Sequence, residues 1–326
     1  MVGLARANNL SLPSKKFFVA KCVIVGANGF LGSYLVDELV LRGHDVTAFD
    51  RFSAEKAHYS AGGVTAVVGD FMNQADIARA LAGQDYVFHF LSTTTPASAE
   101  DDPSLDVRTN IASSIDLLRT CVEAKVSRVY FASTGGAIYG DQPNTVVDEN
   151  TLPQPISPYA IGKLAIERYL GYFERKYGLA SVALRISNPY GPRQRENTVQ
   201  GVIPIFLRRI KSGLPLTIFG DGTMVRDYIY VSDAVGMIAD TVGRDTAYGL
   251  YNVGSGVGTA VRELVEVLRS VTGSNPKLDH TAVPPTFVDH VVLDTRRFAA
   301  EFGSRDLVDL HEGVARTWKA ISEELE

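Results

Sequence analysis

Short hydrophobic runs alternate with longer amphipathic stretches through the first half of the chain. The runs carry apolar side chains at consecutive positions, as parallel strands buried on both faces do. The stretches between them have the spacing of helices with one apolar face. This alternation predicts a doubly wound α/β domain built on a parallel sheet. The predicted strands are Cys22–Val25, Val46–Phe49, Thr65–Val68, Tyr86–Leu91, Arg128–Ala132 and Ser181–Ile186, and the predicted helices include Leu31–Arg42, Gln74–Ala82, Val107–Ala124 and Pro158–Tyr177.

After Ile186 the pattern changes, because proline and glycine become frequent and the regular segments become shorter. We therefore predict a first domain over residues 15–186 and a smaller α/β domain over 187–326. One later stretch again has the pattern of a strand, Tyr228–Val231, followed by an N-capped helix, Asp233–Val242. We expect residues 228–242 to return to the first domain.

The composition excludes several classes of protein. A chain of 326 residues has room for about two domains. Its 32 Lys and Arg against 37 Asp and Glu give a net charge of −5. This charge argues against a nucleic-acid-binding protein and against a protein held on an anionic membrane. Between Arg185 and Arg226, however, seven basic side chains stand against two acidic ones, which favours a small anionic ligand near this segment.

The two cysteines, Cys22 and Cys121, lie in apolar segments and read as buried, inert thiols. They provide neither a disulfide framework nor a CxxC metal site, so we expect no metal. Residues 1–14 lack the apolar core of a signal peptide, and no early apolar run is long enough to cross a bilayer. We expect a cytoplasmic protein with a short N-terminal extension.

A glycine-rich loop joins the first predicted strand to the first predicted helix. Its glycines, Gly26, Gly29 and Gly32, let the backbone approach a pyrophosphate, and the helix N-terminus then offers free N–H groups. Asp50 ends the second strand, where an acid bonds the ribose hydroxyls of NAD and repels the phosphate of NADP. Arg51 beside it blurs this distinction, but we favour NAD.

A tyrosine and a lysine in the predicted helix from Pro158 suggest proton transfer. Ser157 and Pro158 suit the cap and first position of a helix, which places Tyr159 and Lys163 on one face. A cation beside a tyrosine favours the phenolate, so such a residue can act as a base on a hydroxyl group. Two hydroxyl side chains, Ser133 and Thr134, end the preceding strand, where ligands bind in doubly wound sheets.

Together these features resemble the extended short-chain dehydrogenase/reductase family, over about residues 20–300. The matching segments are residues 26–32, Asp50, the Ser-Thr strand end, the Tyr159/Lys163 pair, residues 185–192 and residues 222–231. The last two are typical of the branch that acts on nucleotide sugars, with UDP-glucose 4-epimerases as the nearest likeness. The resemblance implies a Rossmann domain with NAD, a C-terminal substrate domain, a homodimer, and a UDP- or dTDP-linked sugar as substrate.

The resemblance also implies roles for individual residues. Tyr159 would be the base, Lys163 its electrostatic partner and a ribose contact, and Thr134 or Ser133 the catalytic hydroxyl. Asn188 and Arg226 would hold the diphosphate, and Thr217 and Phe219 would lie near the nucleobase of the substrate. The implied cofactor contacts are Gly26, Asn28, Gly29, Phe30, Leu31, Gly32, Asp50, Arg51, Asp70, Phe71, Leu91, Ser92, Thr93, Asn110, Tyr159 and Lys163, and the substrate contacts are Thr134, Asn188, Val202, Thr217, Phe219 and Arg226.

Departures from the family pattern narrow the reaction. Gly135 stands where many epimerases carry the catalytic hydroxyl, so Thr134 is the nearest substitute. Gly136 and Ala137 stand where 4,6-dehydratases carry an acidic pair, which argues against dehydration. Residues 284–290 lack an Arg that often contacts the diphosphate, and Arg193 or Arg195 would have to replace it. Gly201 stands where some members of the family carry an Asn that contacts the nucleotide sugar.

These expectations leave three functions to compare. The leading one is NAD-dependent epimerisation of a nucleotide sugar at C4 through a 4-keto sugar, with Tyr159 as base. The second is a nucleotide-sugar reductase or dehydrogenase on the same scaffold, which would change the amount of reduced nicotinamide. The third is a non-catalytic sensor of NAD(H), for which the presence of both Tyr159 and Lys163 would be surprising.

Overall fold

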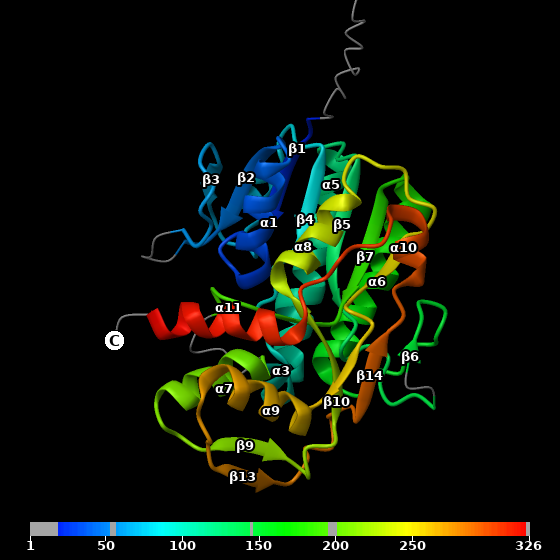
Figure 1. The fold of residues 1–326 in the computed structure, drawn as a ribbon. Helices are drawn as coiled ribbons and strands as arrows, with labels where there is room; N and C mark the ends of the chain where they lie inside the picture. Colours follow the sequence, from blue (N-terminus) through cyan, green and yellow to red (C-terminus); the bar gives the residue numbers. More distant parts are fainter. Residues whose placement is uncertain (1–18, 53–56, 144–145, 195–200, 324–326) are drawn as a thin grey trace, which may run out of the picture.

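The computed structural model describes residues 19–52, 57–143, 146–194 and 201–323. In this part of the chain, seven parallel strands form one sheet in the order β11-β7-β5-β4-β1-β2-β3 (Figure 1). The predicted α/β class with a parallel sheet is confirmed. The strands are β1 (Lys21–Val25), β2 (Asp45–Asp50), β3 (Thr65–Val68), β4 (Tyr86–His89), β5 (Arg128–Thr134), β7 (Ala180–Ile186) and β11 (Leu250–Val253).

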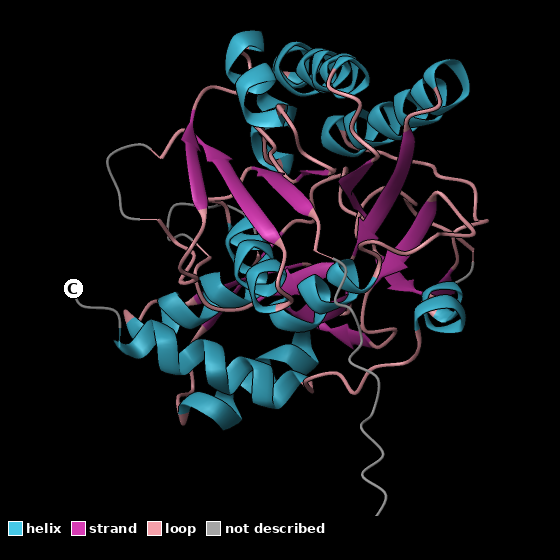
Figure 2. Cartoon of the chain, turned by 90° about the horizontal axis from the view of Figure 1, so that it is seen from above, coloured by secondary structure: helices cyan, strands magenta, loops and turns pink. Residues whose placement is uncertain are grey.

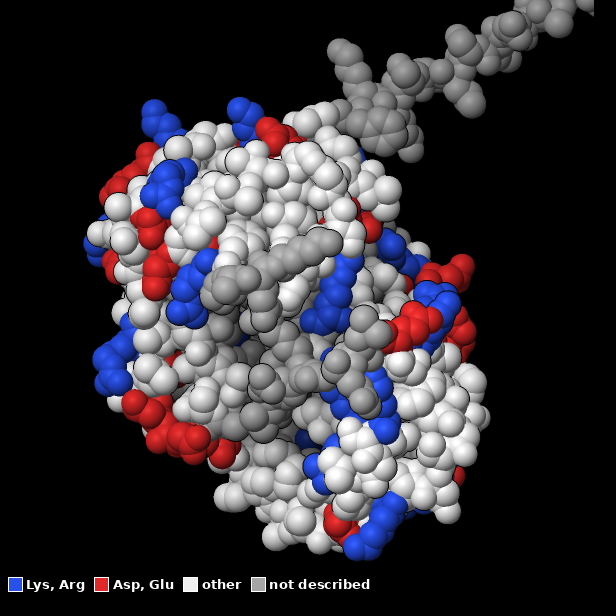
Figure 3. Space-filling view, turned by 90° about the vertical axis from the view of Figure 1, so that its left-hand side faces the viewer, with Lys and Arg blue, Asp and Glu red and all other residues white. Residues whose placement is uncertain are grey.

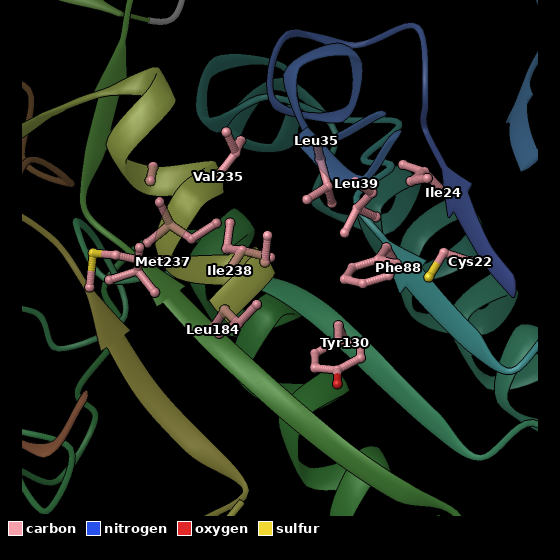
Figure 4. Close-up of a cluster of buried hydrophobic side chains, with 14 of the residues drawn as sticks. Cys22, Ile24, Leu35, Leu39, Phe88, Tyr130, Leu184, Val235, Met237 and Ile238 are labelled. Atoms are coloured by element: carbon pink, nitrogen blue, oxygen red, sulfur yellow. The ribbon is translucent and has the colours of Figure 1, made fainter. Parts of the chain in front are cut away.

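Helices cover both faces of this sheet, as Figure 2 shows from above. On one face, α1 (Phe30–Leu41) and α8 (Val231–Asp240) share a hydrophobic cluster with the strands. On the other face lie α2 (Gln74–Leu81), α5 (Ala112–Glu123) and α6 (Pro158–Tyr177). In Figure 4, Leu35 and Leu39 of α1 and Ile238 of α8 lie over Phe88 and Tyr130 of the strands. Burial on both faces explains why the strand sequences are apolar at consecutive positions.

Three elements from beyond residue 186 join this first layer. Helix α8 packs against α1, β11 pairs in parallel with β7, and α10 (Arg296–Phe302) packs on β11. The predicted division at residue 186 stays a proposal. Of the residues 228–242 expected to return, α8 packs against α1, whereas residues 228–230 belong to β10 (Val225–Tyr230) of the second layer. Strand β11 and α10 add two segments that the hydrophobic pattern did not reveal.

The second layer lies below the large sheet in Figure 1. Strand β10 (Val225–Tyr230) pairs with β8 (Asn188–Tyr190), β12 (Gly258–Ala260) and β14 (His290–Leu293), and β14 also pairs with β6 (Val146–Val147). A separate pair joins β9 (Leu216–Phe219) to β13 (Leu278–Thr281). Helices α7 (Val202–Lys211), α9 (Val261–Thr272) and α11 (Leu310–Glu323) contribute to the hydrophobic cluster of this layer. Since β8 begins two residues after β7 ends, this layer adjoins the carboxyl edge of the sheet, where ligands bind in such folds.

Some element boundaries differ from the sequence-based expectations. Strand β5 runs on to Thr134, so both candidate hydroxyls belong to the strand. The predicted helix Val107–Ala124 is divided, because Val107–Ile111 forms a π-helical turn, η1, before α5; it follows the short helices α3 (Pro96–Asp101) and α4 (Pro103–Asp106). Helix α8 begins at Val231 rather than Asp233 and has no side-chain cap, so the expected capped start at Asp233 was wrong.

Candidate functional site

The glycine loop between β1 and α1 is fixed by close backbone contacts. Gly26 has a φ of 94°, and a Cβ atom there would lie 2.8 Å from the backbone nitrogen of Leu91. A Cβ atom on Gly32 would lie 2.1 Å from the carbonyl oxygen of Gly26. Helix α1 begins at Phe30, and its cap residue, Gly29, contributes no side-chain bond to the first turn. The first-turn N–H groups are therefore available to an anion such as a pyrophosphate.

Asp50, at the end of β2, lies beside this loop. The Asp50 carboxylate accepts hydrogen bonds from the backbone N–H of Asn28 at 2.9 Å and of Arg51 at 2.8 Å. The Asn28 side-chain oxygen accepts the N–H of His58 at 2.8 Å. An acid in this position, beside a glycine cradle and a free helix end, fits the ribose and pyrophosphate of a dinucleotide.

The remaining expected cofactor contacts follow β3 and β4. Asp70 accepts the N–H of Met72 at 2.9 Å, as a turn residue does, and Phe71 is buried in the core against the ring of His89. Leu91 packs at the edge of the same core. Phe71 therefore lies in the hydrophobic core. Leu91 also borders the cavity beside Tyr159. Ser92 donates to the carbonyl of Thr94. Leu31 is half-buried in the first turn of α1.

Asn110 holds the segment that follows β4. It lies in the π-helical turn η1, a feature that is frequent at functional sites. Its side-chain oxygen accepts the N–H and hydroxyl of Thr93 at 2.8 and 2.9 Å, and its amide donates to Thr94 and Asp106, each at 2.7 Å. Asn110 is buried, and its hydrogen bonds fix the position of Thr93.

Tyr159 and Lys163 lie together near the start of α6. The Ser157 side chain accepts the N–H of Ala160, and Pro158 is the first helical residue, so the predicted helix start is confirmed. The Lys163 ammonium lies 5.6 Å from the centre of the Tyr159 ring. It donates to the carbonyl oxygen of Ala132 in β5 at 2.9 Å. The pair therefore faces the carboxyl end of the sheet.

The electrostatics of this pair differ from the expectation. Burial, followed by the negative charge of Asp106, raises the pKa of Tyr159 to about 12. Burial lowers the pKa of Lys163 to about 8, against the opposing effects of Asp106 and Glu167. The expectation that Lys163 gives Tyr159 a lowered pKa was wrong for this structure. The physical reason is that burial disfavours the charged phenolate and that the Asp106 carboxylate repels it.

The two candidate hydroxyls at the end of β5 have different surroundings. Ser133 is buried and donates to Glu167 at 2.6 Å, and Glu167 pairs with Arg185 at 2.8 Å. Thr134 is half-buried, and within the described residues its hydroxyl has no hydrogen-bond partner. A Cβ atom on Gly135 would lie 2.5 Å from Leu293, so this position has no room for a hydroxyl side chain. These contacts favour Thr134 over Ser133 as the group free to meet a substrate.

Gly136 adjoins Asn188, another expected substrate contact. A Cβ atom on Gly136 would lie 3.3 Å from the Asn188 amide, which itself donates to the carbonyl of Asp227 at 3.0 Å. A side chain at Gly136 would require Asn188 to shift by a few tenths of an ångström. This crowding agrees with the absence of the dehydratase acids from the sequence.

Arg226 and Phe219 contact the segment that lacks the expected arginine. The Arg226 guanidinium donates to the carbonyls of Val288 and Asp289. Burial lowers the pKa of Arg226, which nevertheless stays charged. The Phe219 ring packs on Phe287, with 5.1 Å between ring centres, and both rings are more than a third exposed. Thr217 lies in the same strand as Phe219, and Val202 begins α7, each half-buried.

Several basic side chains of segment 185–226 are engaged by other parts of the protein. Arg185 is buried in the ion pair with Glu167, and Arg209 donates to the carbonyl of Pro215. Arg193, a suggested substitute for the missing arginine, bonds Asp37 at 2.7 Å and lies over the Tyr34 ring of α1. The other suggested substitute, Arg195, lies outside the described residues. Basic and acidic side chains are interspersed on the face in Figure 3.

Sequence reasoning missed two buried groups beside Tyr159 and Lys163. Asp106 and His89 border the same small cavity as the pair. Burial and the charge of Lys163 lower the pKa of His89 to about 3, so the ring is neutral. Asp106 stands four residues before Asn110, a helical spacing that could have indicated it. No cluster of three or more potential metal ligands occurs in the part of the chain that the structure describes, nor does any helix there have the length and apolar character to span a membrane.

Comparisons with known proteins agree with this geometry. The model of the NAD dependent epimerase/dehydratase family matches residues 22–254. A UDP-glucose 4-epimerase of Mycolicibacterium smegmatis is 32% identical over 305 residues, covering 91% of this chain and 97% of that protein. The solved structure of the Thermus thermophilus UDP-glucose 4-epimerase in complex with NAD is 33% identical with a TM-score of 0.87, covering 93% and 99% of the two chains. A dTDP-glucose 4,6-dehydratase of Streptomyces venezuelae, DesIV, is 26% identical with a TM-score of 0.83, covering 93% and 97%.

Proposed function

Because the chain belongs to the NAD dependent epimerase/dehydratase family, we propose that it epimerises a nucleotide sugar at C4 through a transient 4-keto sugar. Its cofactor is NAD, which fits the glycine cradle, the uncapped start of α1 and Asp50. The observation that supports the proposal is that the half-buried Tyr159 lies beside the buried Lys163 at the carboxyl edge of the sheet. This pair adjoins a strand end with a free hydroxyl, Thr134.

In the proposed reaction, bound NAD would supply two things: a positive charge, and a group that accepts a hydride from C4 and can return it to the same carbon. Tyr159 takes the proton of the 4-hydroxyl as the sugar is oxidised and gives it back as the sugar is reduced. Because the pKa of Tyr159 is raised to about 12, its action as a base would need the positive charge of the nicotinamide in addition to that of Lys163.

The proposed substrate carries UDP or dTDP. Arg226 uses three of its five N–H donors on the carbonyls of Val225, Val288 and Asp289, which leaves two for a phosphate. Asn188 lies on the neighbouring strand β8. The exposed ring of Phe219 would lie against the nucleobase of the substrate.

Dehydration is disfavoured because Gly136 and Ala137 stand where the acids needed for water elimination are expected. Reduction or oxidation of a nucleotide sugar remains the rival activity. It differs from epimerisation in consuming or producing reduced nicotinamide, which is measured by absorbance.

The proposed catalytic hydroxyl is that of Thr134, and the two candidates are separable. Thr134→Val is expected to lower kcat by about 10- to 100-fold, the effect of losing one hydrogen bond to a charged oxygen of about 1.5–3 kcal/mol. Ser133→Ala is expected to act mainly on thermal stability, because it removes the bond to Glu167. Steady-state kinetics and melting curves of both variants are the measurements. A larger loss of kcat in Ser133→Ala would reverse the assignment.

We also propose a homodimer. Three exposed apolar side chains, Ile161, Tyr169 and Tyr172, lie along one face of α6, and Val107 is exposed on η1, which packs against α6. A second copy of this chain would cover them. Sedimentation is expected to give twice the mass of one chain, and Tyr172→Glu is expected to halve it. A wild-type protein that sediments as a monomer at micromolar concentration would contradict the dimer. We place the protein in the cytoplasm, where its two buried free thiols would stay reduced.

A panel of UDP- and dTDP-linked sugars tests the proposed function. Each sugar is incubated with the purified protein and followed by proton NMR, with absorbance recorded for reduced nicotinamide. The proposal expects conversion of at least one sugar to its C4 epimer without net reduced nicotinamide. Stoichiometric reduced nicotinamide would support the reductase or dehydrogenase, and the loss of water from the sugar would support a dehydratase.

A further inference from the structure

Asp106 is a buried carboxylate that the proposed chemistry does not use. It is the last residue of α4 and is 3% exposed. An acid is rarely buried this completely unless its charge is paired or fully hydrogen-bonded. Its surroundings therefore indicate what holds the charge and what the charge acts on.

One oxygen of Asp106 organises the cofactor side of the site. Its Oδ1 accepts the Thr94 hydroxyl at 2.5 Å and the Asn110 amide at 2.7 Å. The same Asn110 amide also donates to Thr94, which closes a three-membered network. Since Asn110 in turn holds Thr93, Asp106 fixes the segment after β4 through two neighbours.

The other oxygen lies against the catalytic helix. A Cβ atom on Gly162 would lie 2.0 Å from Asp106 Oδ2, so the carboxylate fits only because this position of α6 is glycine. Gly162 lies between Tyr159 and Lys163 in the sequence of α6. The Asp106 carboxylate therefore lies against the turn of α6 that carries Tyr159 and Lys163.

The other charged groups around this carboxylate are accounted for. Lys163 is the cation that shares its cavity, and His89 from β4 is neutral. Glu167 of α6 is paired with Arg185 of β7. On the elements packed against α4, Glu100 and Asp101 are exposed, and Asp102 pairs with Arg108 at the surface. Among the described residues, Asp106 thus differs from Glu167 in that no arginine pairs with its buried carboxylate.

We infer that Asp106 is a positioning residue of the site: its carboxylate fixes Asn110 and Thr94 and acts through space on Tyr159 and Lys163. The role rests on the proposed function, since it assigns Asp106 to the same reaction. Its negative charge opposes ionisation of Tyr159 and favours the protonated form of Lys163. In addition to burial, the charge therefore raises the pH range in which Tyr159 changes its protonation state.

Asp106→Asn tests this role, because asparagine keeps the oxygen that accepts from Thr94 and Asn110 and loses the charge. The purified holoprotein is labelled with ¹³C-tyrosine, and the Tyr159 signal is assigned by its absence in Tyr159→Phe. The midpoint of its titration is expected to shift to lower pH in Asp106→Asn, because the opposing negative charge is gone. Asp116→Asn, at an exposed site on α5, is the matched control and is expected to leave the midpoint unchanged.

The acidic limb of kcat against pH is expected to move in the same direction in Asp106→Asn. An unchanged Tyr159 midpoint in a folded Asp106→Asn protein would overturn the inference. Because the titration needs no substrate, it decides the role of Asp106 even if no nucleotide sugar is epimerised. A failure of the proposed function would appear separately, in the NMR panel.

A second variant applies if Asp106→Asn does not fold. Gly162→Ala adds a methyl group that forces the carboxylate away from Tyr159 and Lys163 without changing the charge of the chain. Its Tyr159 midpoint is also expected to fall. Gly171→Ala on the same helix, where an added Cβ meets open space, is the control and is expected to behave as wild type. Equal midpoints for Gly162→Ala and Gly171→Ala would contradict the inference.

Discussion

Tyr159→Phe is expected to lower kcat by about 10²- to 10⁴-fold, the usual contribution of a positioned proton donor and acceptor. The variant keeps the ring that packs beside Lys163 and loses only the hydroxyl. NAD is therefore expected to stay bound, since the glycine loop and Asp50 are unchanged. The measurements are kcat on the substrate found in the panel and the nicotinamide released on denaturation.

Tyr177→Phe is the control for this result. Tyr177 ends the same helix and is half-exposed, so removing its hydroxyl is expected to leave kcat within about twofold of wild type. Near-normal turnover by Tyr159→Phe would remove Tyr159 from the mechanism and, with it, the proposed acid–base chemistry.

Gly32→Ala is expected to have the largest effect on the cofactor. The added methyl group would lie 2.1 Å from the carbonyl oxygen of Gly26, so either α1 or the loop must shift. Overpacking of this kind costs about 1–3 kcal/mol of stability and would displace the N–H groups that face a pyrophosphate. Loss of bound NAD after gel filtration and a lower Tm are the expected results.

Gly171→Ala is the matched helical control for Gly32→Ala. An added Cβ on Gly171 meets nothing within 4 Å, and alanine is the better helix former by about 1 kcal/mol. It is expected to keep NAD and to raise Tm slightly. Retention of NAD by Gly32→Ala at the wild-type level would show that the loop does not bind the pyrophosphate as proposed.

The sequence was sufficient for the features that depend on local patterning. Consecutive apolar residues predicted the buried strands, and Ser157-Pro158 predicted the start of α6. The glycine spacing predicted a loop whose tightness the structure explains through contacts of Gly26 and Gly32. The roles of the individual site residues stay predictions until variants are measured.

Long-range contacts account for what the sequence did not reveal. The charge of segment 185–226 suggested an anion site, but Glu167 and Asp37 neutralise Arg185 and Arg193 from distant parts of the chain. The Tyr–Lys spacing suggested a lowered tyrosine pKa, whereas burial and Asp106 act in the opposite direction. Such partners are brought together by tertiary packing, which cannot be predicted from the spacing of residues along one helix.

Proton NMR of the reaction in D₂O tests the central claim most directly. If the same hydride leaves C4 and returns to it, the C4 epimer forms with its C4 proton retained and no solvent deuterium on the sugar ring. The proposal predicts this result, with no net reduced nicotinamide. Deuterium at C4 of the product, or deuterium at C5 or C6 with loss of water, would contradict it.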